Sequence, residues 1–354
     1  MFKVGFAGTA KNTGKTTAVM YFLRQANIRK ERVGLTGIGY DGEGFDHLTG
    51  LPKPRVICQG GCIIATAKGC LGRGTATYRI LRDLSLYNAL GQLYLLEIVS
   101  PGEIVIAGPN TRRDLQCTMD AFRQVGCELV LVDGAFGRLG PFAEVDGLIL
   151  ATGAARTPDI DSLVQDTRAL EQIFALPVAN TPKEIQGGNT ITLFLEDGGV
   201  KKFKSASLLS RALVTKIARS VASAAVVFIP GAVPGELLWQ LYRKVGKGFA
   251  GKTMVFSDPT KLLLSGNYKK TGIALEGFIG KGGRVVVKKR IPLLALVINP
   301  FYPLSTNNSF RKAFINYDIL KQALAEVSGV PVINVKETRQ NYYLDASRRE
   351  VRVD

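Results

Sequence analysis

A run of small, hydroxyl-bearing and lysine residues near the start of the chain has the spacing of a loop that binds phosphate. The run follows a short apolar segment, Phe2–Phe6, and reads Gly8-Thr9-Ala10-Lys11-Asn12-Thr13-Gly14-Lys15-Thr16-Thr17. Its second half matches the pattern G-x-x-x-x-G-K-[ST], while Thr9 stands where the first glycine belongs. The backbone N–H groups of such a loop and the positive end of the following helix both attract phosphate oxygens. The sequence therefore predicts a nucleoside triphosphate site between a first strand and a first helix.

The side chains of this loop have distinct expected roles. Lys15 supplies a positive charge to the β- and γ-phosphates, and Thr16 places its hydroxyl on Mg²⁺. Thr17 is within reach of the α-phosphate, and Lys11 is a second cation inside the loop. The competing interpretation is a turn rich in glycine and threonine that caps the helix of residues 15–26 and binds nothing.

A triphosphate site also needs acidic side chains to hold Mg²⁺ or its waters. Asp133 directly follows the apolar run Leu129–Val132, so we expect it at the end of a neighbouring strand. Asp41 and Glu43 lie in a glycine-flanked segment. Three roles are expected of their carboxylates: contact with Mg²⁺, activation of water or binding of a substrate. Arg138 is expected to pair with a phosphate or a substrate carboxylate. The alternatives are a strand that ends in an Asp-Gly turn and a solvated acidic turn.

These arguments define three sets of candidate residues. The expected catalytic residues are Lys15, Asp133, Asp41 and Glu43. The expected ligands of Mg²⁺ are Thr16, Asp133 and Asp41. The expected nucleotide-binding residues are Gly8, Thr9, Lys11, Asn12, Thr13, Gly14, Lys15, Thr16, Thr17 and Arg138.

Short apolar runs alternate with amphipathic segments, which predicts an α/β fold with a doubly wound, mainly parallel sheet. We expect a nucleotide-binding domain over 1–178, with a β-rich insertion or antiparallel edge at 51–110 that includes a helix at 76–90. A linker or hairpin at 179–200 precedes a second, basic α/β domain at 201–338. That domain is expected to contain a strand at 293–298 and a helix at 310–327, and residues 339–354 form a charged tail.

Positive charge is concentrated in one block of the chain. Residues 1–200 carry equal numbers of basic and acidic side chains, whereas residues 201–300 hold 18 Lys and Arg against 3 Asp and Glu. Such a block attracts an acidic protein partner, a nucleic acid or a phosphorylated ligand. Aromatic residues are not interleaved with the charges, so base stacking is not indicated. A solvated basic surface is the plain alternative.

Cysteine and hydropathy patterns indicate a cytoplasmic protein without a membrane span. The five cysteines are Cys58, Cys62, Cys70, Cys117 and Cys127, an odd number that favours free thiols. A metal site at Cys58, Cys62 and Cys70 is the alternative, although their spacing matches no standard pattern. The chain has no run of 18 apolar residues, and its start leads straight into the first strand, which predicts no signal peptide. His47 is the sole histidine, so a site rich in histidine is excluded.

The phosphate-loop region resembles the dethiobiotin synthetase family. The resemblance covers about residues 1–175 and is carried by the segments Gly8–Thr16, Val132-Asp133-Gly134-Ala135-Phe136-Gly137 and Val145-Asp146-Gly147-Leu148-Ile149-Leu150. It implies the fold of that superfamily of phosphate-loop proteins, which includes the cobyrinate amidases, with ATP and Mg²⁺ as cofactors. It also implies Lys15 and Thr16 at the phosphates and Mg²⁺, and a homodimer as one expected form. Ala10 stands where the family has an acid, Asp133 where it has glutamate, and the basic half has no counterpart there.

A second resemblance is to reactivase subunits associated with cobalamin-dependent aminomutases. It is carried by the segments Thr36-Gly37-Ile38-Gly39-Tyr40-Asp41-Gly42-Glu43, Ile106-Ala107-Gly108-Pro109 and Asp133-Gly134-Ala135-Phe136-Gly137-Arg138. It implies an ATP-driven factor that helps exchange a damaged cofactor of a partner enzyme. The charge of the basic block at 201–300 separately makes that block the expected binding site for a protein partner. The alternatives are an ATP-dependent small-molecule ligase or kinase and a nucleic-acid-associated ATPase. Asn180 and Asn299 each end an apolar stretch and are candidates for reading the nucleotide base, whose identity stays open.

Overall fold

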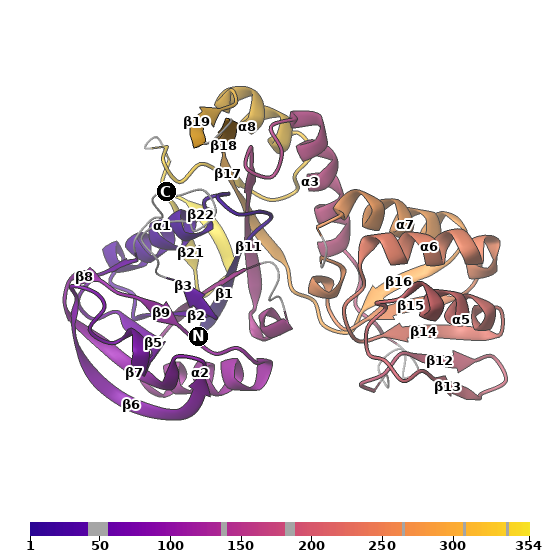
Figure 1. The fold of residues 1–354 in the computed structure, drawn as a ribbon, viewed down its shortest axis with the longest axis horizontal. Coiled ribbons are helices and arrows are strands. Elements are labelled where there is room, and N and C mark those ends of the chain that lie inside the picture. The colour runs from indigo at the N-terminus through magenta and orange to yellow at the C-terminus, as the bar shows by residue number, and fades with distance from the viewer. Residues whose placement is uncertain (42–55, 136–139, 181–187, 264–265, 307–308, 338–339) are drawn as a thin grey trace. The chain divides into compact units, whose positions relative to one another are not determined.

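The structure, a computed structural model, shows an α/β protein made of two compact units (Figure 1). It describes residues 1–41, 56–135, 140–180, 188–263, 266–306, 309–337 and 340–354. The first unit combines residues 1–163 with 293–354, and the second contains residues 164–292. The chain therefore leaves the first unit, builds the second and returns.

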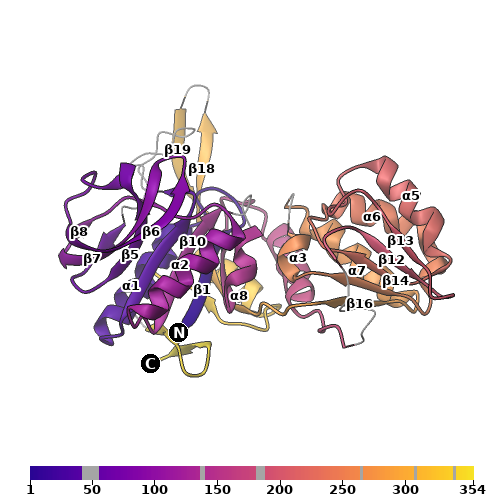
Figure 2. The same cartoon turned by 90° about the horizontal axis from the view of Figure 1, so that it is seen from below.

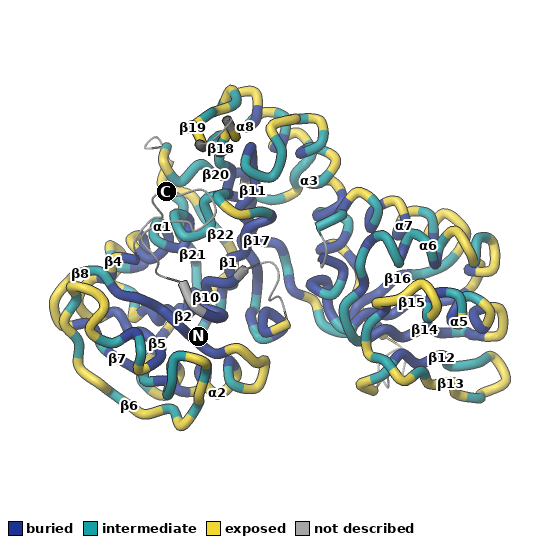
Figure 3. Tube along the Cα trace, viewed as in Figure 1, coloured by how far each residue is buried: buried dark blue, intermediate teal, exposed yellow. Residues whose placement is uncertain are grey.

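The first unit is built on a nine-stranded sheet that is mostly parallel. Strand pairs are parallel from β20 to β5, and β7 and β6 add an antiparallel edge. The central strands are apolar and buried, as in a sheet covered on both faces, whereas β6 is mostly exposed (Figure 3). In spatial order the strands are β20 (Val332–Ile333), β17 (Leu293–Asn299), β11 (Gly147–Gly153), β1 (Phe2–Gly8), β10 (Leu129–Ala135), β2 (Val33–Ile38), β5 (Ile63–Ala67), β7 (Gly91–Ser100) and β6 (Thr77–Asn88).

Helices α1 (Lys15–Ile28) and α2 (Arg112–Gln124) cover opposite faces of this sheet. Helix α1 buries an apolar stripe that includes Phe22 against Phe6 of β1, with ring centroids 5.7 Å apart. Helix α2 packs on the other face, where a Cβ on Gly34 of β2 would lie 2.7 Å from Phe122. Successive strand residues point to opposite faces, so the two helices bury apolar residues on both sides of a mostly parallel sheet. Helix α3 (Ile160–Phe174) comes directly after β11 in the chain, and helix α8 (Tyr317–Ala325) comes directly before β20.

Within residues 56–110, strands β5, β7 and β6 form one edge of the main sheet, and the helix expected at 76–90 is wrong. That segment is strand β6, paired with β7 in antiparallel register. Tyr78, Ile80, Leu84 and Leu86 recur at even positions among polar residues, which is the period of a strand. The short pairs β3 (Tyr40–Asp41) with β9 (Ile106–Ala107) and β4 (Ile57–Cys58) with β8 (Gly102–Glu103) complete the region.

The chain beyond residue 292 differs most from the expected domains. Strand β17 pairs with β11 in the first unit rather than belonging to a second domain at 201–338. The helix expected at 310–327 is helical only in its second half, because residues before it form the hairpin of β18 (Phe301–Thr306) and β19 (Ser309–Phe314) (Figure 2). The expected tail also folds: β21 (Tyr342–Asp345) pairs with β22 (Glu350–Val353), and the Tyr342 N–H donates to the Tyr21 hydroxyl of α1 at 2.7 Å.

The second unit is a smaller α/β layer. Strands β14 (Ala224–Ile229), β15 (Thr253–Phe256) and β16 (Arg284–Val287) are parallel, and the hairpin of β12 (Thr192–Leu195) and β13 (Val200–Lys202) adds an antiparallel edge. The segment expected as a linker or hairpin thus contributes to a sheet. Helix α6 (Gly235–Val245) packs between α5 (Arg211–Val221) and α7 (Tyr268–Gly280). This unit carries 20 Lys and Arg against 8 Asp and Glu, so most of the protein's excess charge lies in it.

Candidate functional site

The predicted phosphate-binding segment lies at the carboxyl edge of the large sheet. Strand β1 runs between β10 and β11, and Gly8 at its end is in register with Ala135 of β10 and Ala151 of β11. The chain then turns through residues 9–14 and begins α1 at Lys15. Ligands of open α/β sheets bind at this edge, where the ends of parallel strands meet the first turns of helices.

Local hydrogen bonds hold the loop in shape. The Thr9 N–H donates to the Ala151 carbonyl at 2.9 Å, and the Thr9 and Thr152 hydroxyls lie 3.0 Å apart. The Thr13 hydroxyl donates to the Ala10 carbonyl at 3.0 Å. Thr9 and Thr13 are both buried, so these two hydroxyls support the loop rather than face a ligand.

Two residues of the loop have backbone conformations that turn it sharply. Asn12 has a φ of 63° and Gly14 a φ of 91°, in the left-handed region that L side chains rarely adopt. Asparagine and glycine are the residue types that tolerate it best, which explains their occurrence here. Gly8 is also required, because a Cβ on it would lie 2.6 Å from the Thr13 hydroxyl.

Helix α1 presents its positive end to this edge of the sheet. Gly14 is its N-cap and provides no side-chain acceptor, and its first turn contains no acidic residue. The dipole of a 14-residue helix is therefore not offset by a carboxylate of its own first turn. Thr16 and Thr17 lie half-buried in that turn, and Lys11 is exposed on the loop.

The structure brings together Lys15 and Asp133, which are 118 positions apart in the sequence. The Lys15 Nζ donates to Asp133 Oδ1, and the two side chains are 18% and 5% exposed. Asp133 lies opposite Phe6 in the register of β10 with β1, two residues before both strands end. A buried carboxylate is costly unless it is paired, so the ion pair stabilises both charges beside the loop.

The structure also adds a residue to this site that we considered from the sequence only as a base reader. Asn299 ends β17, and its Nδ2 donates to the Asn12 carbonyl at 3.0 Å. Its Oδ1 accepts the Phe301 N–H at 3.2 Å, and its own carbonyl accepts the Ala154 N–H at 2.9 Å. Asn299 therefore ties the left-handed part of the loop to β17. The one sequence signal is an apolar run that ends in Asn-Pro.

Other predicted residues are not placed beside Lys15. The backbone of Asp41 pairs with Ile106, so it belongs to the strand that follows β2 at the same edge of the sheet. Glu43, Arg138 and His47 lie outside the described residues. Asn180 lies in the second unit, where its Oδ1 accepts a hydrogen bond from Arg284 at 3.0 Å.

The cysteines form no metal centre within the part of the chain that the structure describes. Cys58 and Cys62 are buried in the same apolar cluster. The pKa of Cys62 is raised well above its ordinary value, mainly by the hydrogen bond with Cys58 and secondly by burial. Cys70 belongs to a separate apolar cluster. Burial raises the pKa of the Cys70 thiol and raises that of Cys127 to about 12. All five thiols are free, as expected, and Cys117 alone is exposed.

Thiol labelling should therefore detect one reactive cysteine in the folded protein. At pH 8 a thiol with a raised pKa stays protonated, and only the thiolate attacks a disulfide reagent. We expect one fast equivalent with Ellman's reagent, its loss in Cys117→Ser, and five equivalents in denaturant without reductant. Two or more fast thiols in the native protein, or fewer than five after unfolding, would contradict this assignment.

Comparisons with protein-family models, with curated proteins and with solved structures find no match to this chain. Among the described residues, no helix combines the length and apolar character needed to cross a bilayer. Any functional proposal must therefore rest on the residues of the site and on the charge of the second unit.

Proposed function

We propose that this protein binds ATP with Mg²⁺ at the loop between β1 and α1, hydrolyses it, and acts in the cytoplasm as an accessory factor for a partner enzyme. The observation that carries the proposal is the ion pair of Lys15 with Asp133 at the start of a helix whose N-cap residue, Gly14, has no side-chain acceptor. A cation, a carboxylate and a helix N-terminus around a tight loop suit a triphosphate with its metal ion.

The residues present fit both parts of the ligand. Phosphate oxygens can accept hydrogen bonds from the backbone N–H groups of the loop, from the N–H groups of the first turn of α1 and from the Lys15 ammonium. The Thr16 hydroxyl and the Asp133 carboxylate are oxygen ligands of the kind that Mg²⁺ prefers, and the sequence offers Asp41 as a further candidate ligand. When bound, the metal ion neutralises charge on the phosphate oxygens. Lys15 would then exchange Asp133 for phosphate oxygens.

An accessory role accounts for the second unit better than a metabolic role does. That unit has 20 basic against 8 acidic side chains, a surplus that favours an acidic macromolecular partner. The chain enters it after β11 and returns through β17, and the ends of both strands contact each other beside the loop through Ala154 and Asn299. A change in the loop on ATP binding thus has a direct route into both connections.

The partner class follows only from the second resemblance, which suggests reactivation of a cobalamin-dependent aminomutase. An ATP-dependent ligase or kinase remains the alternative, with Lys11 and Arg138 on a transferring phosphoryl group. A homodimer also remains a proposal.

Calorimetric titration of the full chain with ATP tests the nucleotide site. We expect saturable binding that tightens with Mg²⁺, together with slow turnover in the absence of a partner. Absence of binding with and without Mg²⁺ would refute the site. Rapid turnover on addition of a small organic acid would instead favour the ligase.

Asn299→Ala should weaken ATP binding by about tenfold, the equivalent of one lost hydrogen bond that orders the loop. The Asn12 carbonyl would lose its partner, and the left-handed turn would be less populated before binding. The dissociation constant measured by calorimetry reports the change. Asn180→Ala is the matched control, because Asn180 lies in the second unit, and it should leave the affinity unchanged. Equal affinities in wild type and Asn299→Ala would remove Asn299 from the site.

A further inference from the structure

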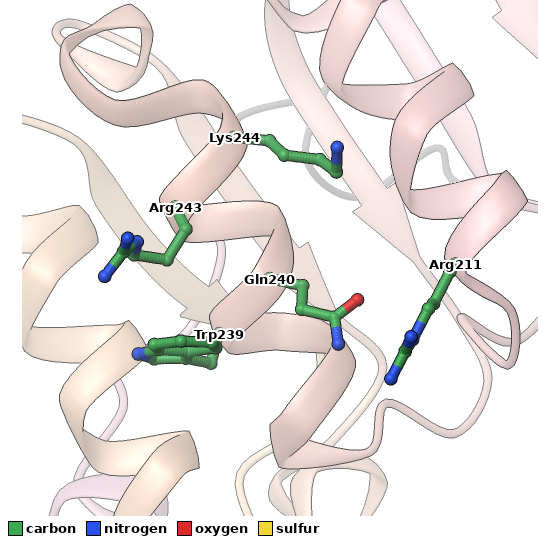
Figure 4. Close-up of a pocket in the computed structure, with 5 residues that line it drawn as sticks. All are labelled: Arg211, Trp239, Gln240, Arg243 and Lys244. Atoms are coloured by element: carbon green, nitrogen blue, oxygen red, sulfur yellow. The ribbon is translucent and has the colours of Figure 1, made fainter.

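A basic pocket between α5 and α6 of the second unit contains the protein's single tryptophan. It is a shallow depression of about 350 Å³ that is widely open to solvent and is lined by Arg211, Trp239, Gln240, Arg243 and Lys244 (Figure 4). Arg211 is the first residue of α5, and the others come from α6. Trp239 with Arg243, and Gln240 with Lys244, are four apart, so each pair lies on one side of the helix.

Cations lie over the indole ring of Trp239. The guanidinium carbon of Arg243 is 5.2 Å from the ring centroid, and the Nζ of Lys270 from α7 is 5.3 Å from it. Both distances are within the range of cation–π attraction. The half-buried ring therefore holds Arg243 in place at the pocket while its guanidinium remains exposed. A cation fixed in this way loses less conformational freedom when it binds an anion.

Within the described part of the chain, the pocket's cations lack direct carboxylate partners, although Glu236 lies close enough to Arg211 for that charge to help lower the pKa of Glu236. Among the described residues, no carboxylate forms a salt bridge with Arg211, Arg243 or Lys244. The nearby acid, Glu236, pairs with Lys270 and accepts a hydrogen bond from Gln240 at 3.1 Å. The hydrogen bond from Lys270 is the main reason that the pKa of Glu236 is lowered, so this carboxylate stays ionised and engaged with Lys270. Three exposed cations consequently face solvent around an apolar ring.

We propose that this pocket is the docking site for an acidic segment of a partner protein. Carboxylates of that segment pair with the guanidinium groups of Arg211 and Arg243, and an apolar side chain beside them packs against Trp239. Guanidinium groups match carboxylates in planar, two-point geometry. Nucleic acid is disfavoured, because single strands stack successive bases on several aromatic side chains and Trp239 is the one aromatic residue among those that line the pocket. Naming the partner as the enzyme being serviced rests on the proposed function, whereas the docking chemistry does not.

The tryptophan makes the pocket directly observable, since all intrinsic tryptophan emission comes from Trp239. The full chain is titrated with a synthetic peptide of glutamate and leucine that lacks aromatic residues, and with the same peptide carrying glutamine for glutamate. We expect a saturable change of emission with the acidic peptide alone. The affinity should fall as salt is raised from about 50 mM to 200 mM, because ion pairs at a surface are screened.

Charge reversal tests the residue assignment. Arg243→Glu should weaken peptide binding by about tenfold or more. The affinity of this variant is measured by the fluorescence anisotropy of a labelled peptide, because the substitution lies next to Trp239 and would itself change the tryptophan emission. Arg219→Glu, an exposed arginine on α5 outside the pocket, makes the same change of net charge and should alter affinity by less than about twofold. Arg243→Lys keeps the positive charge, so its affinity for the peptide should be closer to that of wild type than to that of Arg243→Glu.

Three outcomes would overturn the docking site: no emission change with the acidic peptide, equal loss in Arg219→Glu and Arg243→Glu, or displacement of the peptide by oligothymidylate at lower concentration. The last would assign the pocket to nucleic acid. Lys15→Ala, tested without nucleotide, should bind the peptide like wild type. If the wild-type protein bound the peptide but not ATP, the proposed function alone would be refuted.

Discussion

Lys15→Ala is expected to raise the dissociation constant for ATP by about 100-fold or more while the chain remains folded. Among the candidate cations in the described ranges, Lys15 is the one that is both partly buried and held beside the loop, at 18% exposure and paired with Asp133. A charge-assisted hydrogen bond is worth about 1.5 to 3 kcal/mol, and 2.7 kcal/mol corresponds to about 100-fold in affinity. Calorimetry with ATP and Mg²⁺ measures the loss.

The matched control for this variant is Lys11→Ala. Lys11 is a lysine of the same loop, but it is exposed, so its contribution is screened by solvent. We expect its removal to weaken ATP binding by less than about tenfold. If both variants lose affinity equally, the loop attracts the nucleotide through general positive charge, and the special role of Lys15 fails.

The chain should tolerate Lys15→Ala because the core beneath the loop is independent of the ion pair. Phe2, Val4 and Phe6 of β1 and Phe22 of α1 are all buried in one cluster. The variant removes the Lys15 ammonium from the buried Asp133 carboxylate, which costs up to about 3 to 5 kcal/mol of unfolding free energy. Thermal unfolding followed by circular dichroism should therefore show a lowered Tm and an unchanged native spectrum.

Asp133→Asn is expected to retain ATP binding and to lose at least about 100-fold of Mg²⁺-dependent turnover. Asparagine keeps the size of the side chain and removes the charge that would hold the metal ion, whose stabilisation of phosphate charge is worth several kcal/mol. Affinity for ATP without Mg²⁺ should be equal or higher, because Lys15 is released from its partner and one negative charge near the phosphates is gone. Steady-state turnover at varied Mg²⁺ separates the two effects.

Asp146→Asn provides the control for this change. Asp146 lies just before β11, at the amino edge of the sheet, where it pairs with Lys3 at 3.4 Å. Its replacement removes the same charge at the opposite end of the strands and should leave turnover unchanged. Normal hydrolysis of ATP by both Asp133→Asn and Lys15→Ala would contradict the whole assignment of the site.

A double-mutant cycle on stability tests the ion pair without any ligand. Each single variant removes the Lys15–Asp133 ion pair and keeps one of its two charges near the loop, whereas Lys15→Ala combined with Asp133→Asn keeps neither. The double variant should therefore be more stable than the sum of the single losses predicts. Additive losses would mean that the two side chains do not interact in solution.

Local patterns were sufficient for the strand, loop and helix at the start of the chain. Each depends on neighbours in sequence: an apolar run for β1, glycine and asparagine where the backbone turns left-handed, and apolar positions at helical spacing for α1. The placement of Asp133 at the end of a buried strand follows from the same kind of signal. Residues 76–90 show the limit, because exposed strand β6 is only weakly apolar and its alternation is interrupted by irregular register with β7.

Contacts between distant segments were decided by the tertiary structure alone. An apolar run predicts a buried strand but not the sheet that it joins, so β17 was expected in the second domain although it pairs with β11 of the first. The contact of Asn299 with Asn12, 287 positions apart, follows from that pairing. The hairpin of β21 and β22 is a second example. Its charged sequence predicts an extended tail, whereas in the structure Leu344 of β21 is buried in the core of the first unit. Burial on folding rewards any partner surface of the right shape, and sequence order does not reveal which surface that is.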